Sequence, residues 1–90
     1  LTDSEWSELV LLIDATYSNF TSRILELSPR LSPEELRICY LVKIGVPVKK
    51  IAILTNITSS GVSQCRRRLY KKLTQESENA EKFDSFISDF

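Results

Sequence analysis

The sequence predicts an all-α fold, and three observations support that prediction. Apolar residues recur at spacings of three and four along most of the chain, which is the period of a helix that buries one face. No alternation of apolar and polar residues lasts long enough to indicate a strand. Only two of the 90 residues are glycine and three are proline, so helix breaks are few. A chain of this length forms one structural domain with a modest core.

The first 31 residues carry one continuous apolar stripe. Its members are Trp6, Val10, Ile13, Tyr17, Phe20, Ile24, Leu27 and Leu31. The stripe fits a single long helix with a coiled-coil seam, or two helices broken near Ser18-Asn19. We favour the break, because the residues around it are weak helix formers and good N-caps. Residues 1–30 are therefore expected to form a helical pair that packs on the rest of the domain.

The next helix has clear start and stop signals. Ser28-Pro29 ends the preceding region, because proline cannot continue the helical hydrogen bonding. Ser32-Pro33-Glu34-Glu35 then predicts a capping box with proline at the first helical position. Gly45 can end this helix in the left-handed conformation.

Three further helices complete the predicted fold. A helix of about two turns spans residues 48–55, and Asn56 can turn the chain with a positive φ. Thr58 or Ser59 caps the next helix, which runs to about Leu73 with an apolar face. That face comprises Val62, Cys65, Leu69 and Leu73. Residues 74–79 are polar, and a last amphipathic helix carries Phe83, Phe86, Ile87 and Phe90.

The segment from Ile51 to Leu69 has the spacing of a helix-turn-helix. Ala52 supplies the small residue where two steeply crossed helices touch, and Asn56 supplies the turn. We expect the angle between the helices to be filled by Ile51, Ile57, Val62 and Cys65. The domain thus divides into an extension (1–30), a helix-turn-helix core (31–74) and a linker with a C-terminal helix (75–90).

The charge of the chain is strongly segregated, although its formal net value is zero. Residues 1–35 sum to −5 and residues 76–90 to −4, whereas residues 36–75 hold nine cations and no acid. An acid-free basic stretch centred on two crossed helices is typical of nucleic-acid binding.

The outward face of the second of these helices carries side chains suited to DNA. Gln64 can pair bidentately with adenine and Arg67 with guanine in the major groove. Hydroxyls at Ser59, Ser60 and Ser63 can meet phosphates or base edges near the helix N-terminus. Other cations suit contacts to the DNA backbone or a solvated face, namely Lys49, Lys50, Arg66, Arg68, Lys71 and Lys72.

These residues resemble the LuxR/GerE-type helix-turn-helix domain. The resemblance covers residues 5–73 and rests on Leu31–Leu36, Lys49–Ala52, Val62 and Arg68–Leu73. Within it, the stretch from Trp6 through Phe20, Pro29 and Leu31-Ser32 is similar to an extension found in regulators of Bacteroidetes. By resemblance, base reading falls on Ser63, Gln64 and Arg67, and phosphate contacts fall near Ser60, on Arg66 and on Lys49-Lys50. The chain departs from the family pattern at Lys50, Gly61, Ser63 and Cys65.

The resemblance also implies a biological setting. Such domains are transcription regulators that bind double-stranded DNA, often as the C-terminal output module of longer sensor or repeat proteins. The family's fourth helix commonly mediates homodimerisation, which would involve Phe83, Phe86, Ile87 and Phe90. Packing of that helix against the first helices of the chain is the alternative. The chain starts at Leu1, and we expect it to be part of a longer cytoplasmic protein.

Other functional classes are disfavoured. The chain has no histidine, so histidine-dependent nucleophilic and zinc sites are excluded. Cys39 and Cys65 lack metal-ligand spacing and are expected to be small core residues in a reducing compartment. We therefore expect no enzyme, no cofactor, no metal and no contact of this segment with a membrane. The alternatives to a DNA-binding regulator are a protein-interaction or dimerisation module and a sigma-factor-like module that associates with polymerase.

Overall fold

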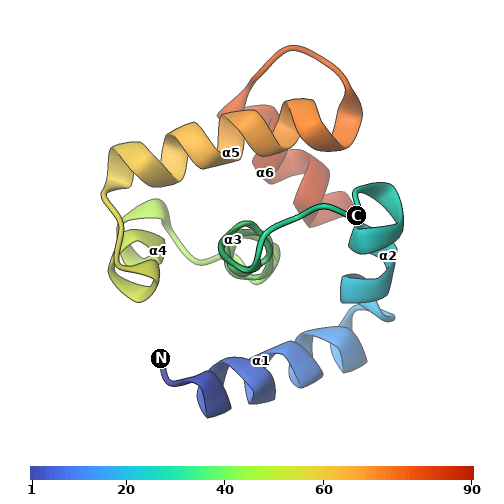
Figure 1. Cartoon of the computed structure of the whole chain (residues 1–90), viewed down its shortest axis with the longest axis vertical. Coiled ribbons are helices and arrows are strands. Elements are labelled where there is room, and N and C mark those ends of the chain that lie inside the picture. Colours follow the sequence, from blue (N-terminus) through green and yellow to red (C-terminus); the bar gives the residue numbers. More distant parts are fainter. The chain divides into compact units, whose positions relative to one another are not determined.

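The computed structural model describes all 90 residues and consists of six helices without strands (Figure 1). The helices are α1 (Asp3–Thr16), α2 (Phe20–Leu27), α3 (Pro33–Lys43), α4 (Val48–Thr55), α5 (Ser59–Thr74) and α6 (Ala80–Asp89). The prediction of an all-α fold is confirmed. The chain divides into two compact units, Leu1–Arg30 and Leu31–Phe90. None of the helices combines the length and the apolarity that crossing a bilayer requires.

The first unit contains α1 and α2, with a sharp break between them. Ser18 and Asn19 have φ angles of 52° and 59°, in the left-handed region. Two successive residues of this kind cannot belong to an α-helix. The single long helix is therefore wrong and the predicted break is confirmed, whereas the packing of residues 1–30 on the rest of the domain stays a prediction.

Side chains from both helices stabilise this break. Asp14 Oδ1 of α1 accepts hydrogen bonds from Thr21 N and Thr21 Oγ1, at 2.8 and 2.9 Å. The carboxylate thereby caps the N-terminus of α2, where negative charge is favourable. In return, Arg23 donates to Tyr17 O at 2.6 Å and to Ser18 O at 2.9 Å, beyond the end of α1. The side chain of Asn19, the residue before α2, makes no capping hydrogen bond. The cap is thus supplied by Asp14 of α1 and not, as the sequence predicts, by a residue at the break.

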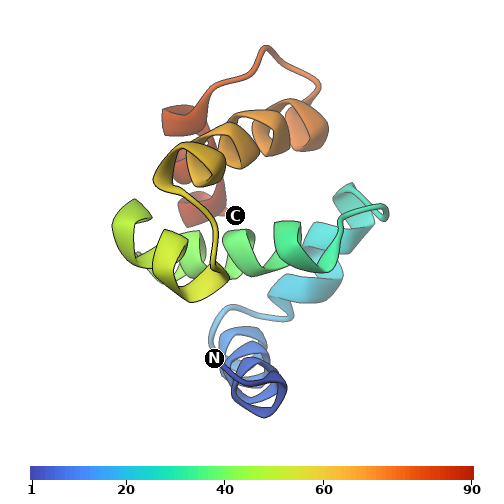
Figure 2. The same cartoon turned by 60° about the vertical axis from the view of Figure 1, so that its left-hand side comes forward.

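In the second unit, α3 begins and ends as the sequence predicts. Ser32 N donates to Glu35 Oε1 at 2.9 Å, and Glu35 N donates to Ser32 Oγ at 3.1 Å. The helix ends before Gly45, whose φ is 82°. Residues Ile38–Val42 are buried without interruption, because α3 contacts α4, α5 and α6. Helix α3 therefore forms the centre of this unit, with α4, α5 and α6 against it (Figure 2).

Helices α4 and α5 are joined by a tight connection. Asn56 has φ 59° and ψ 40°, as predicted, and Ile57 N donates to Ala52 O at 3.1 Å. Thr58 Oγ1 then accepts from Gly61 N at 3.0 Å and caps α5. Ile51 and Val62 are buried in the expected positions. Ile57 is not, since it is 43% exposed, so its prediction as a core residue is wrong.

The last helix packs inside the second unit. Helix α6 contacts α5 and α3, and the side chains of Phe83 and Ile87 are fully buried. Lys43 of α3 donates to Ile87 O and Ser88 O, at 3.2 and 3.0 Å, and so satisfies carbonyls near the end of α6. Phe83 and Ile87 cannot form the surface contact proposed for dimerisation, because their surface is already covered within the chain. Within the second unit the helix is anchored to α3 and α5, and its packing against the first helices stays a prediction.

Candidate nucleic-acid interface

The nine cations of residues 36–75 fall into groups with different surroundings. Lys43, Arg66 and Lys72 bind groups inside the second unit. Arg37 of α3 is half-buried. The remaining cations are exposed, and they are Lys49, Lys50, Arg67, Arg68 and Lys71. Only the exposed group is available to a partner, so the basic stretch presents fewer charges than the sequence indicates.

Arg66 is an internal clamp between α5 and α6. Its side chain is 9% exposed and forms an ion pair with Asp84. Arg66 Nε lies 2.9 Å from Asp84 Oδ1, and Nη2 bonds to Asp84 Oδ2. Nη2 also lies 3.4 Å from Ala80 O and Nη1 lies 3.5 Å from Ser63 Oγ. These contacts occupy the guanidinium, so we remove Arg66 from the residues expected to contact a DNA backbone.

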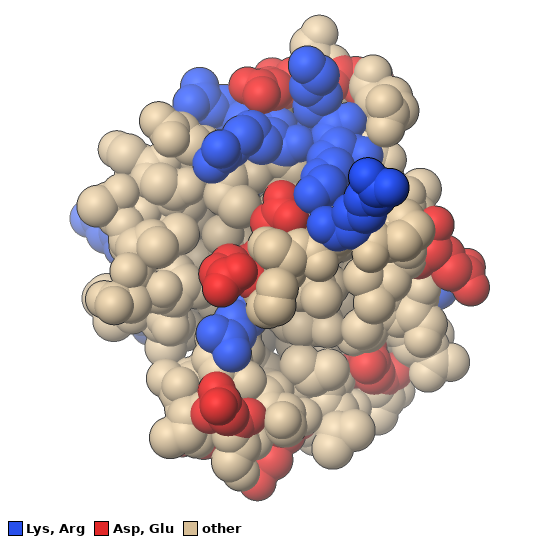
Figure 3. Space-filling model, in the orientation of Figure 1, with Lys and Arg blue, Asp and Glu red and all other residues tan.

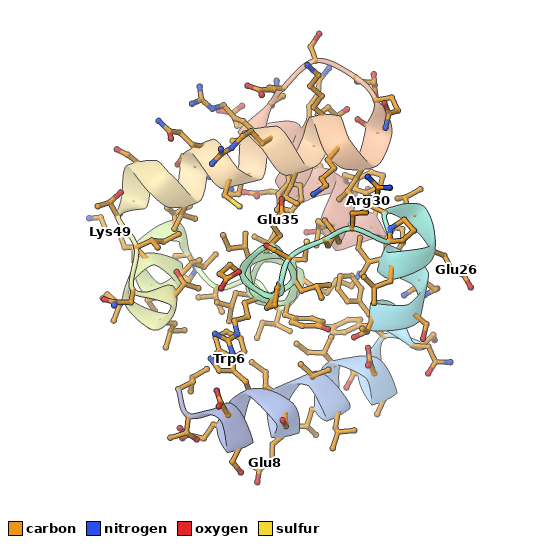
Figure 4. The ribbon with its side chains drawn as sticks, viewed as in Figure 1. Trp6, Glu8, Glu26, Arg30, Glu35 and Lys49 are labelled. Atoms are coloured by element: carbon orange, nitrogen blue, oxygen red, sulfur yellow. The ribbon has the colours of Figure 1, made fainter.

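Lys72 links α5 to the start of α3. Its Nζ lies 3.1 Å from Glu35 Oε1, the same oxygen that accepts from Ser32 N. Figure 4 shows Glu35 on the side of α3 that faces α5. Partial burial raises the pKa of Glu35, but the hydrogen bonds from Ser32 and Lys72 outweigh it, so its pKa lies below the ordinary value. The ionised carboxylate is thus part of the packing of the second unit.

The exposed cations lie on the two helices that the tight connection joins. Lys49 and Lys50 are in the first turn of α4, and Lys49 extends away from the ribbon in Figure 4. Arg67, Arg68 and Lys71 lie on α5, over which Lys and Arg side chains gather in Figure 3. No carboxylate pairs with any of these five side chains. Their charge is therefore directed to solvent or to an anionic partner.

The first two turns of α5 form a polar surface. A shallow depression there is lined by Ser59, Ser60, Ser63, Gln64 and Arg67. The lining thus combines two of the predicted DNA-backbone residues, Ser59 and Ser60, with all three predicted base-reading residues, Ser63, Gln64 and Arg67. Ser63 is half-buried, and the other four are exposed. The depression offers hydroxyl, amide and guanidinium groups with no acidic side chain among them.

The N-terminus of α5 adds backbone donors to this surface. Gly61 N donates a hydrogen bond to the Thr58 hydroxyl. The backbone N–H groups of Ser59 and Ser60, in the first turn, have no acceptor within the helix. Because the helix dipole is positive at this end, an anion is favoured there. A Cβ on Gly61 would lie 3.2 Å from Thr58 Oγ1, so a larger residue at this position would crowd the capping hydroxyl.

Cys39 is a buried residue of α3, and Cys65 is a half-buried residue of α5. Burial raises the pKa of Cys39 far above the ordinary thiol value, and burial also raises the pKa of the half-buried Cys65. Both thiols are free and protonated at neutral pH. They therefore act as small packing residues, in agreement with the prediction for their role.

The sequence did not reveal which cations bind inside the unit. Asp84 is 18 residues from Arg66 and Glu35 is 37 residues from Lys72, so neither pair has a local spacing. A partial signal exists for Arg66, because it follows Val62 by four residues on the apolar side of α5.

Phe86 and Phe90 of α6 keep partly exposed rings, with centroids 5.7 Å apart.

Comparison with known proteins gives no relative for this chain. No family model matches it, and neither a curated protein nor a solved structure matches it.

Proposed function

We propose that α4 and α5 form a helix-turn-helix that binds double-stranded DNA, with the N-terminal half of α5 in the major groove. The observation that carries the proposal is the outer face of these helices. It combines five unpaired cations with an acid-free depression of hydroxyl, amide and guanidinium groups. Duplex DNA offers the matching chemistry, because phosphates line a groove in which base edges expose donors and acceptors.

The proposed roles follow from position along the helix. Gln64 and Arg67, which are one turn apart on the exposed side, read base edges, and Ser63 lies between them and the helix start. Ser59 and Ser60, with their backbone amides, bind a phosphate at the helix N-terminus. Lys49, Lys50, Arg68 and Lys71 bind phosphates on either side of the groove. A helix of 16 residues is about 24 Å long, so its last turns extend beyond the groove.

The proposed biological role is transcription regulation. The LuxR/GerE resemblance of residues 31–73 supports a regulator whose other domains receive the signal. An isolated DNA-binding unit of this size contacts one half-site, so a homodimer would raise affinity and set the half-site spacing. Phe86 and Phe90 are the members of the predicted dimerisation set whose rings remain partly exposed.

A module that only binds protein is the weaker candidate. Its support in the sequence is the N-terminal heptad seam and the aromatic C-terminal helix. The helix that carries the seam is broken at Ser18 and Asn19, and Phe83 and Ile87 of the C-terminal helix are fully buried. That function also leaves five unpaired cations on α4 and α5 without a role. It predicts self-association that is insensitive to salt and no affinity for duplex DNA.

Binding to duplex DNA with Gln64→Ala and Arg67→Ala variants tests the proposal. We expect the wild-type protein to bind a mixed-sequence duplex at low salt, as measured by fluorescence anisotropy. On duplexes enriched from a random pool by the wild-type protein, each substitution should lower affinity about tenfold. Its effect on unselected duplexes should be smaller, since a base contact carries sequence information.

Lys82→Ala is the matched control, because Lys82 is an exposed cation on α6 outside the proposed interface. It should leave affinity for both kinds of duplex within about twofold of the wild type, as expected for a screened surface charge. Absence of duplex binding at low salt would refute the proposed function. Equal losses on selected and unselected duplexes would refute base reading by Gln64 and Arg67.

A further inference from the structure

Helix α4 is apolar on two opposite sides. Ile51 is 1% exposed and packs in the core, whereas Ile53 is 78% exposed. Two residues correspond to about 200° around an α-helix, so these side chains cannot share a face. Folding of the second unit therefore does not require an apolar residue at position 53.

A second isoleucine lies near Ile53, beyond the end of α4. Ile57, in the connection to α5, is 43% exposed. Ile53 and Ile57 line one shallow depression together with Lys49, Ala52, Asn56, Thr58 and Ser59. The lining contains one cation and no acid. A ligand that fits it carries an apolar group beside a negative charge.

This depression continues the proposed DNA-binding face. Ser59 lines both this depression and the one that holds Gln64 and Arg67. Lys49, at the opposite end of α4 from Asn56, belongs to the exposed cations of that face. The continuity of the two depressions favours one ligand over two, and it favours DNA over a separate acidic peptide.

Resting on the proposed function, we propose that Ile53 and Ile57 bind thymine methyl groups beside a phosphate held by Lys49. Thymine is the one base that presents a methyl group in the major groove, and apolar side chains recognise it there. The preferred duplex thus contains thymine next to the base pairs contacted by Gln64 and Arg67. Ile53 and Ile57 are specificity-determining residues, while the charges supply affinity for any sequence.

Replacing thymine by deoxyuridine tests this inference, because the exchange removes the methyl group and keeps the base pairing. The probe is the duplex most strongly enriched from a random pool by the wild-type protein, resynthesised with each thymine replaced in turn. We expect at least one replacement to lower wild-type affinity about fourfold, which corresponds to one buried methyl group. Ile53→Ala should bind the thymine and deoxyuridine duplexes equally at that position.

The Ile53→Ala variant should remain folded, because an exposed isoleucine is lost and alanine favours the helix. Ile57→Ala provides a second variant, with its thermal unfolding recorded alongside. Leu12→Ala is the matched control, since Leu12 is 65% exposed on α1 in the other unit. It should retain the full preference for thymine.

The outcomes separate the two proposals. Complete absence of duplex binding refutes the proposed function and this inference together. Duplex binding in which no deoxyuridine replacement matters refutes the inference alone. So does a thymine preference that both isoleucine variants keep, and the exposed isoleucines would then belong to a protein contact.

Discussion

The two faces of α5 use the same kind of residue for opposite purposes. Arg66 and Arg67 are neighbours in sequence, and both are cationic. Arg66 is buried against α6 and bonded to Asp84, whereas Arg67 is exposed and lines the polar depression at the start of α5. Consecutive residues are about 100° apart around an α-helix, so the two side chains lie on different faces. Arg66 therefore stabilises the fold, whereas Arg67 is available to bind a ligand. Local composition alone therefore cannot separate stability from function on this helix.

The inner face of α5 ties three helices together. Arg66 joins it to α6, Lys72 joins it to α3, and Val62 and Leu69 are fully buried beneath. The outer face makes no such contacts. Variants of the inner face should change the free energy of unfolding, and variants of the outer face should change binding and leave stability intact.

The largest expected effect on stability comes from an apolar residue of α6, the helix that packs on the inner face of α5. Phe83→Ala removes a fully buried ring of α6 and should destabilise the protein by about 3–5 kcal/mol. Phe86→Ala is the matched change in the same helix, at a half-buried ring that meets Tyr70 with centroids 6.5 Å apart. In urea unfolding, Phe86→Ala should lower the free energy of unfolding clearly less than Phe83→Ala does. Equal costs would contradict the assignment of Phe83 to the core and Phe86 to its edge.

Paired substitutions at the two arginines come next. Arg66→Ala should lower the free energy of unfolding by about 2 kcal/mol, below the range for a fully buried pair because Asp84 is 45% exposed. Arg67→Ala should change it by less than about 0.5 kcal/mol, as is usual for an exposed side chain. Chemical denaturation of both variants measures the difference. A larger loss for Arg67→Ala would reverse the roles of the two faces.

The next expected effect on stability, smaller than that of Arg66→Ala, concerns Glu35 and its dependence on pH. Because the folded pKa of Glu35 is below its ordinary value of 4.5, ionised Glu35 stabilises the fold above about pH 5. That contribution is lost as the pH falls through the folded pKa. Because Lys72, which pairs with Glu35, is 38% exposed, we expect the ionised carboxylate to contribute about 1 kcal/mol or less to the free energy of unfolding.

Unfolding of wild type and Glu35→Gln at pH 7 and pH 3 measures this contribution. The wild-type protein should be the more stable at pH 7, and the difference should shrink at pH 3. Glu34→Gln, at the exposed neighbouring carboxylate, is the control and should differ little from the wild type at either pH. A difference for Glu35→Gln that stays constant with pH would contradict the stabilising role of the ionised carboxylate.

Helix positions were predictable from the sequence because their signals are local. The capping box at Ser32, the left-handed Gly45 and Asn56, and the start of α5 depend on residues within one turn. The first break is also predictable, but its caps are not. Asp14 and Arg23 reach across from positions five to seven residues away.

The tertiary partners of charged and apolar residues could not be predicted. The pairing of Arg66 with Asp84 requires α6 to fold back along α5, and nothing in the spacing of residues 66–84 specifies that. Similarly, Phe83 and Ile87 form one amphipathic stripe with Phe86 and Phe90. A stripe shows that a helix has an apolar side, but it does not distinguish a contact within the chain from one with a second copy.

The central claim is that the outer face of α4 and α5 binds duplex DNA through five unpaired cations. It is tested most directly by the affinity for a mixed-sequence duplex as a function of salt concentration. If Lys49, Lys50, Arg68 and Lys71 each neutralise one phosphate and Arg67 reads a base, the logarithm of the association constant should fall with the logarithm of salt at a slope of about −3.6. Lys49→Ala should make that slope about 0.9 less steep, and Lys82→Ala should leave it unchanged. No binding at low salt, or a slope that Lys49→Ala and Lys82→Ala alter equally, would contradict the claim.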